Sequence, residues 1–244
     1  VTKLKRAVPR MIQYRSPRYV CALASYLSPV EKQLGRLVSH RSFGLTGKPT
    51  PLTAKGLNAR ERAKLVKAKA AQFADVEIWP LDFTTFDRSI SPAALRIEHA
   101  IYNAIWRAPE LRELLSAQLV NRCRTRNGWV YKRAGGRMSG DYNTSLGNTL
   151  LALLALVAAA RATGLAKFDL LVDGDDCLLF VERGSLDPEA FRVALSGMGF
   201  EAGFEPAHHR LPGLPFGRAR YCDLPDGARF VREWRRHIST MFTR

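Results

Sequence analysis

Three aspartates interrupt an apolar stretch in the segment LVDGDDCLLF, residues 171–180. Charged carboxylates beside a buried core need a neutralising partner, because desolvating an unpaired charge is strongly unfavourable. Asp173 and Gly174 are typical of tight hairpin turns, so a plain turn is one explanation. The adjacent pair Asp175 and Asp176 between two apolar strands favours the other explanation, a metal-binding turn.

A further carboxylate, Asp82, ends a strand predicted in the segment DVEIWPLDF. If this strand lies beside the two strands around the acidic turn, Asp82 converges with Asp175 and Asp176. Converging like charges raise each other's pKa and require a cation, and several oxygen ligands favour Mg²⁺ or Mn²⁺. Two such ions, about 3.5–4 Å apart, would activate an attacking hydroxyl and stabilise a leaving oxygen in phosphoryl chemistry.

A second group of polar residues lies in the segment RMSGDYNTSLGN. Ser139 and Gly140 offer a hydroxyl and an unobstructed backbone just before a predicted helix. Thr144 and Asn148 are four residues apart, so they share one helical face and could both reach a hydroxyl of a ligand. Helix capping is the alternative role for Thr144, and equally for Asn143.

Asp87 follows Asp82 by five residues and lies further along the same loop. Its alternative role is to cap the turn before Ser91. Ser91 is itself a predicted N-cap, because Pro92 follows it at the first position of a helix. One face of that helix is expected to carry Leu95, Tyr102, Ile105 and Trp106.

The elements that must position these residues are helices, strands and one tight hairpin. An extended cationic arm is expected over residues 1–19, because residues before proline avoid the helical region. Apolar spacing and capping residues predict helices over residues 20–38, 58–73, 145–164 and 187–198 and a loop over 43–56. The order of elements indicates an α+β or mixed α/β domain.

The composition indicates a folded protein with a polyanionic partner. The chain has 38 Lys+Arg against 22 Asp+Glu, a net charge of +16, which favours nucleic acid or an acidic membrane surface. The longest apolar run, residues 150–160, is too short to cross a bilayer and is expected to be a buried helix. Because the chain begins with Val1, we expect a fragment of something longer. Its cysteines show no spacing typical of zinc or disulfides, which favours a reducing, intracellular setting: Cys21, Cys123, Cys177 and Cys222.

Three segments, LDFTTFD, MSGDYNTSLGNTLL and DGDDCLLF, occur in this order. They resemble motifs A, B and C of the RNA-dependent RNA polymerases of positive-strand RNA viruses. The leading segment PRMIQYRSPRY, continued by LASYLSPVE, resembles the basic motif F of the tombusvirus-like and carmovirus-like group, and LTAKGLNARERAKLVKAK resembles that group's segment between motifs F and A. The resemblance runs from near Val1 to about Val181, and more faintly to the end.

The resemblance implies roles for individual residues. Asp82 and Asp175 would bind two Mg²⁺ or Mn²⁺ ions, with Asp176 in support. Asp87 and Asn148 would recognise the ribose 2′-OH of a nucleoside triphosphate with help from Thr144. Ser139 and Gly140 would lie in a flexible loop that positions nucleotide and template.

The basic motif F would guide and neutralise the triphosphate through Arg10 and Arg15, with Lys3 and Lys5. Arginine suits this role because its planar fork binds two phosphate oxygens at once. A solvated cationic arm, or an arm that contacts RNA phosphates, is the alternative.

A basic hairpin is predicted in the segment RCRTRNGWVYKR, because its Asn-Gly pair is a strong hairpin signal. Arg122, Arg124 and Arg126 alternate, so one face of the strand would be wholly cationic. We expect this face to follow template or product RNA, and a plain exposed strand is the alternative.

Three positions depart from the pattern of the family. Gly203 stands where motif D usually has a lysine that protonates the leaving pyrophosphate, and His208, His209 or Arg210 would have to replace it. Thr85 stands where motif A commonly has arginine. In motif E, Phe216-Gly217 replaces the usual Phe-Cys pair.

The resemblance implies a right-hand polymerase palm, a small antiparallel sheet with helices on one face, together with part of the fingers. Residues 1–75 and 109–137 would belong to the fingers side, and residues 76–108 and 138–244 to the palm, with no thumb.

Expected partners are template and product RNA, nucleoside triphosphates and the remaining replicase segments, and no transmembrane segment is expected. The expected location is the host cytoplasm, in a viral replication complex on intracellular membranes. A non-catalytic RNA-binding module is the alternative from another class, and a reverse transcriptase is the nearer enzymatic alternative.

Overall fold

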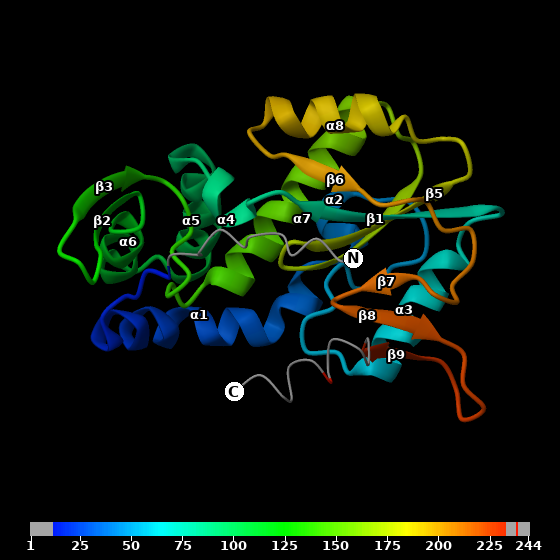
Figure 1. The fold of residues 1–244 in the computed structure, drawn as a ribbon, viewed down its shortest axis with the longest axis horizontal. Helices are drawn as coiled ribbons and strands as arrows, with labels where there is room; N and C mark the ends of the chain where they lie inside the picture. The colour runs from blue at the N-terminus through cyan, green and yellow to red at the C-terminus, as the bar shows by residue number, and fades with distance from the viewer. Residues whose placement is uncertain (1–11, 233–237, 239–244) are drawn as a thin grey trace.

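A four-stranded antiparallel sheet forms the centre of the computed structural model, which describes residues 12–232 and residue 238 (Figure 1). Its strand order is β4-β5-β1-β6. The strands are β1 (Val76–Phe83), β4 (Phe168–Asp173), β5 (Asp176–Glu182) and β6 (Ala202–Phe204). The two strands around the acidic turn and the strand that carries Asp82 are therefore neighbours, as the sequence predicts.

The apolar side chains of β4 and β5 are divided between the two faces of the sheet, because successive side chains of a strand point to opposite faces. One face receives Phe168, Leu170, Val172, Cys177, Leu179 and Val181. The other face receives Leu171, Leu178 and Phe180. Most buried residues of β4 and β5 on both faces are apolar, which explains the nearly unbroken hydrophobic runs around the turn.

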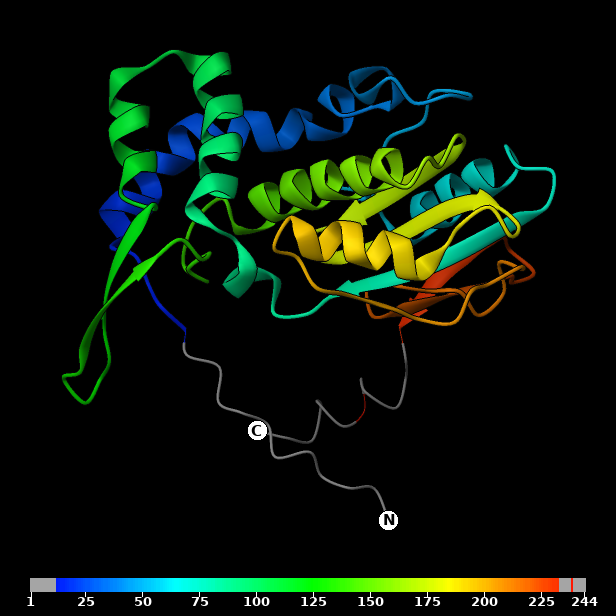
Figure 2. The same cartoon turned by 90° about the horizontal axis from the view of Figure 1, so that it is seen from above.

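Two helices, α7 (Thr144–Ala162) and α8 (Pro188–Gly197), cover the first face of the sheet (Figure 2). Asp187 caps α8 by accepting hydrogen bonds from the backbone N–H groups of Glu189 and Ala190. Helix α7 is the one helix in the described part of the chain whose length and hydropathy would allow a membrane span. In this fold 72% of its apolar window is buried, so α7 packs as a core helix.

The second face of the sheet is covered by α3 (Ala59–Ala70) and by a three-stranded sheet of β7 (Pro215–Phe216), β8 (Ala219–Cys222) and β9 (Arg229–Arg232). Figure 2 shows this small sheet on the side of β1 away from α7 and α8. The expectation of helices on one face alone is therefore wrong. The sequence pattern missed the second layer because its strands are short and separated by Gly and Pro.

The other end of the molecule holds α1 (Pro17–Leu37), α5 (Pro92–Trp106), α6 (Pro109–Ser116) and the hairpin of β2 (Val120–Arg124) and β3 (Val130–Ala134) (Figure 1). Two single-turn helices, α2 (His40–Phe43) and α4 (Phe86–Ser89), complete the fold. The predicted N-caps Asn58 and Ser91 are confirmed by hydrogen bonds to the first turns of α3 and α5.

Two predictions for this end are wrong. Helix α1 begins at Pro17 and not at residue 20, because Ser16 caps the first turn by accepting a hydrogen bond from the Tyr19 N–H. On α5, Ile105 and Trp106 are 47% and 39% exposed. The buried face of α5 instead carries Glu98 and His99, which a purely apolar pattern does not indicate.

Candidate active site

The carboxylates of three adjacent strands form a row at one end of the central sheet. Asp176 on β5 pairs in register with Asp173 on β4 and with Asp82 on β1. Because directly paired residues share a face, all three lie on the side of the sheet that meets β7–β9. Asp175 occupies the turn between β4 and β5. The convergence predicted from the sequence is therefore present in the fold.

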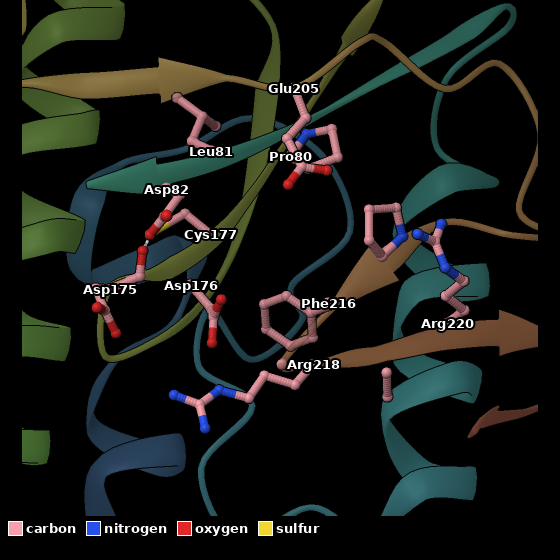
Figure 3. Close-up of a pocket in the computed structure, with 13 residues that line it drawn as sticks. Pro80, Leu81, Asp82, Asp175, Asp176, Cys177, Glu205, Phe216, Arg218 and Arg220 are labelled. Carbon is pink, nitrogen blue, oxygen red and sulfur yellow. Dashed lines mark hydrogen bonds between the residues drawn. The ribbon is translucent and has the colours of Figure 1, made fainter. Parts of the chain in front are cut away.

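Asp82, Asp175 and Asp176 line one cavity of about 480 Å³ (Figure 3). The opposite wall comes from the turn between β7 and β8, with Phe216 and Arg218. The positive charge of Arg218 lowers the pKa of Asp176. Arg218 is not among the residues predicted from the sequence, and it lies in a Gly-Arg turn with left-handed backbone, φ 60° at Gly217 and 59° at Arg218.

Burial and neighbouring charge raise the pKa of Asp176 to about 6. Desolvation is the largest cause, and the carboxylates of Asp175, Asp82 and Asp173 follow. Like charges directly opposite each other on neighbouring strands destabilise a sheet. A cation bound beside this row would lower the pKa of Asp176 and restore its ionised form.

A divalent metal ion fits these donors by charge and by hardness, because Mg²⁺ and Mn²⁺ prefer carboxylate oxygens. Asp82, Asp175 and Asp176 are the residues that would hold it. In residues 12–232, no group of three or more acidic, histidine or cysteine side chains could hold a metal ion as it stands. Binding would require these carboxylates to move closer together.

Two contacts fix the acidic turn. Gly174 has φ 72°, a left-handed conformation that suits glycine at the first position of a two-residue hairpin turn. Its N–H donates to Thr149 Oγ1 on α7 over 3.0 Å. Arg62 on α3 forms an ion pair with Asp173 Oδ2 at 2.7 Å and lies over the ring of Phe216. Arg62 thus holds Asp173, and Asp82, Asp175 and Asp176 line the cavity.

The pair proposed for sugar recognition is brought together. Asn148 Nδ2 donates to Asp87 Oδ1 over 2.7 Å, while the cap of α5 is formed by the side chain of Ser91. Thr144, in contrast, directs its hydroxyl to the backbone carbonyls of Met138 and Asp141, at 3.3 and 2.7 Å. The structure therefore favours the local, helix-starting role for Thr144.

The loop of Ser139 and Gly140 is docked against the N-terminal arm. The Gly140 N–H donates to the Gln13 carbonyl over 3.0 Å. A Cβ atom at residue 140 would lie 2.8 Å from that carbonyl oxygen and 2.9 Å from the Tyr14 Cα, so this close approach requires glycine. Ser139 is exposed beside it.

Arg15 belongs to the same arm, and its guanidinium binds Asp141 Oδ1 at 2.6 Å and Asn121 Oδ1 at 2.5 Å. It therefore ties the arm to the loop before α7 and does not reach the acidic turn here. Three other predicted cations lie outside the described residues: Lys3, Lys5 and Arg10.

The basic hairpin is present, with Gly128 at φ 87° in its turn. Arg122 and Arg124 share the exposed face of β2, but Arg126 lies in the turn, and the paired residues Lys132 and Val130 join that face. The face is cationic but not wholly so. All three arginines line a groove of about 690 Å³ together with the arm residues Ile12, Gln13 and Tyr14.

The segment that would replace the lysine of motif D, with His208, His209 and Arg210, lies away from the row of carboxylates. The backbone of His208 pairs with Ile78, four residues before Asp82 on β1, which corresponds to about 13 Å along a strand. Burial lowers the pKa of His208. Gly203 is the residue that pairs with Asp82. Glu205, which was not predicted from the sequence, lines the cavity.

The chain matches known polymerases over nearly its whole length. A family model described as viral RNA dependent RNA polymerase matches residues 1–243. The RNA-directed RNA polymerase of groundnut rosette virus (strain MC1) is 33% identical over 96% of this chain and 27% of that protein. That of turnip crinkle virus is 38% identical over 88% of this chain and 27% of that protein. That of cucumber necrosis virus is 34% identical over 95% of this chain and 28% of that protein.

The chain therefore belongs to the family of viral RNA-dependent RNA polymerases. Within that family its relatives are polymerases of tombusvirus-type and carmovirus-type plant viruses, which confirms the resemblance read from the motifs. The chain spans 27% of the length of the groundnut rosette and turnip crinkle virus polymerases.

Proposed function

We propose that this chain is the palm with part of the fingers of a polymerase that extends RNA 3′ ends on an RNA template, using two divalent metal ions. The observation that carries the proposal is the row of Asp173, Asp176 and Asp82 across three strands, with Asp175 at its end. A plain hairpin turn needs one or two polar residues and does not need a third strand with a carboxylate in register.

The chemistry requires positioning and charge stabilisation more than covalent participation by the protein. Bound divalent ions supply activation of the attacking 3′ hydroxyl and stabilisation of charge on the leaving oxygen. The contribution of the chain is to hold Asp82, Asp175 and Asp176 at one end of a rigid sheet. Arg218 would place a positive charge on the opposite wall, where a triphosphate would enter.

Ribonucleotide selection is assigned to Asp87 and Asn148. A 2′-OH that donates to Asp87 satisfies a group that a deoxynucleotide would leave without its partner. This pair supports an RNA polymerase over a reverse transcriptase. The loop of Ser139 and Gly140, held to the arm at Gln13, would position the nucleotide against the template.

RNA binding is assigned to the groove between the basic hairpin and the arm. Arg122, Arg124 and Arg126 line it, and phosphate contacts are the commonest use of such residues. Lys3, Lys5, Arg10 and Arg15 would contribute to binding of the triphosphate or RNA. Because Arg15 is paired with Asp141, it would have to exchange that partner for phosphate.

The division of the chain follows the same proposal. Residues 76–108 and 138–244 would form the palm and residues 1–75 and 109–137 the fingers side. A thumb and the remaining fingers would come from other segments of the replicase. The site of action would be a replication complex on intracellular membranes in the host cytoplasm.

The competing hypothesis is that the chain is a module that binds RNA without catalysing nucleotide incorporation. A decisive experiment replaces the matching segment of the turnip crinkle virus polymerase with this chain and measures templated incorporation of ribonucleotides and deoxyribonucleotides. Incorporation of ribonucleotides that Asp82→Asn abolishes is expected. RNA binding without incorporation, while the parent polymerase remains active, would favour the RNA-binding module.

A further inference from the structure

Arg137, just before the Ser139–Gly140 loop, contacts both members of the sugar-recognition pair. Its backbone N–H donates to the Asp87 carbonyl over 2.7 Å. Its side-chain Nε–H donates to Asn148 Oδ1 over 3.1 Å. Arg137 thus contacts the turn of α4 through its backbone and the side-chain amide of Asn148, on α7, through its guanidinium.

The guanidinium of Arg137 is itself fixed in a buried network. Its side chain is 0% exposed and forms an ion pair with Glu98 of α5, which is equally buried. Glu98 Oε1 also accepts hydrogen bonds from the Tyr102 hydroxyl at 2.8 Å and from Asn143 Nδ2 at 2.6 Å. Moving the guanidinium would leave Glu98 Oε2 and Asn148 Oδ1 without this donor in a buried site, so these two contacts hold Arg137 in place.

Packing around the ion pair restricts it further. A Cβ atom at Gly147 would lie 2.2 Å from Glu98 Oε1 and 2.3 Å from Arg137 Nη2, so α7 closes directly over the pair. The neighbouring backbone is docked as well, since the Gly136 N–H donates to the Ile90 carbonyl over 2.7 Å. The segment before α7 and the turn of α4 are therefore joined by several hydrogen bonds and packed under α7.

This arrangement determines which way the Asn148 amide points. With its oxygen on the Arg137 Nε–H, the amide directs its NH₂ group to Asp87. The flipped amide would face the Arg137 donor with NH₂ and the Asp87 carboxylate with its oxygen, losing both hydrogen bonds. In the fixed orientation, Asp87 Oδ2 has no hydrogen-bond partner among the described residues and can accept one from a sugar hydroxyl.

We propose that Arg137 is a positioning residue for ribose selection, because it fixes the orientation of the Asn148 amide and the backbone of Asp87 together. This inference rests on the proposed function of the site. Arg137 does not touch the sugar itself and acts through the pair that does.

The test compares the affinities of GTP and dGTP for the chain in the presence of Mn²⁺ by calorimetry. Arg137→Lys keeps the charge beside Glu98 but removes the Nε–H that orients Asn148. We expect Arg137→Lys to bind GTP about tenfold more weakly than the unaltered chain does, because one hydrogen bond to a charged group is lost. The affinity for dGTP should stay the same, because dGTP has no 2′-OH. A merely structural role would weaken both nucleotides equally, and that result would overturn the inference.

Two further variants separate positioning from folding. The double variant Arg137→Met, Glu98→Gln removes both buried charges together. A protein usually loses less stability from this than from the loss of one partner alone, which leaves the other charge buried and unpaired. The double variant should also lose the preference for GTP. The matched control is Arg133→Gln, since Arg133 donates to the Arg88 carbonyl at 2.6 Å in the same turn without contacting Asn148. The control should keep the preference, and preservation of the preference in the Arg137 variants would contradict the proposal.

If the unaltered chain binds neither nucleotide, the proposed function fails in this chain, and the side-chain amide resonances of Asn148 still test the positioning role. We expect its NH₂ signals to be protected from exchange in the unaltered chain and in Arg133→Gln, and to lose protection in Arg137→Lys. Equal protection in all three proteins would overturn the inference independently of nucleotide binding.

Discussion

Asp82 and Asp176 are direct partners across β1 and β5, so two carboxylates face each other where an antiparallel sheet normally pairs compatible side chains. Burial and its acidic neighbours raise the pKa of Asp176 to about 6. The metal-free fold is therefore destabilised by the same residues that would bind metal. Such a conflict between stability and function is expected at an active site.

The first prediction concerns stability. A raised native pKa stabilises the fold below the unfolded-state pKa, and this contribution is lost as the pH rises through about 6. Asp176→Asn should therefore raise the Tm of the metal-free chain at pH 7.5, with a gain that shrinks as the pH falls from 6 toward 4. Thermal unfolding across this range measures it. The control Asp75→Asn, at an exposed ion pair with Arg183, should show no such gain; a gain independent of pH would contradict the explanation.

The second prediction concerns Arg62, which pairs with Asp173 at 2.7 Å. If the ion pair is the main contribution of Arg62, Arg62→Gln should reduce the free energy of unfolding by about 1 kcal/mol more in the unaltered chain than in Asp173→Asn. Denaturant unfolding of the four proteins measures this coupling. Equal losses in both backgrounds would show that Arg62 acts instead through its contacts with Phe216 and the Leu57 carbonyl.

The third prediction concerns the docking of the arm. Gly140→Ala would place a Cβ atom 2.8 Å from the Gln13 carbonyl oxygen, so the arm should separate from the loop. Trypsin should then cleave faster after Arg15. Gly197→Ala is the control, because a Cβ there meets no atom within 4 Å. Unchanged cleavage in Gly140→Ala would mean that the arm is held by other contacts.

The fourth prediction concerns the groove beside the basic hairpin. Replacing Arg122, Arg124 and Arg126 with alanine should reduce the slope of log K against log salt for single-stranded RNA by about 2, at roughly 0.7 per phosphate contact. A matched triple variant of exposed arginines on the helices, Arg96, Arg112 and Arg192, should leave the slope nearly unchanged. Equal slopes for the hairpin variant and the unaltered chain would remove this groove from the RNA-binding surface.

Much of the fold could be predicted because local signals and tertiary structure agree. Asn58 and Ser91 start α3 and α5, and the two-residue turn at Gly174 follows from its flanking strands. The pairing of Asp87 with Asn148 was predicted from motif positions, because those positions correspond to places in a known site. Whether Asp82, Asp175 and Asp176 bind metal stays a prediction.

The parts that were missed depend on contacts between distant segments. Arg218 enters the site through a short turn of a second sheet, and nothing in its local sequence indicates a neighbour on β5. The burial of Glu98 follows from Arg137, 39 residues later, and could not be read from the periodicity of α5. Thr144 shares a helical face with Asn148, but its hydroxyl is taken by the Asp141 carbonyl.

The central claim is that the acidic turn is a metal site, and the most direct test is a calorimetric titration of Mn²⁺ with GTP into the chain and into Asp175→Asn. The account predicts binding by the unaltered chain and none by the variant, since Asp175 lines the cavity with Asp82 and Asp176. Equal binding by both proteins, or binding by neither, would contradict it and favour the RNA-binding module.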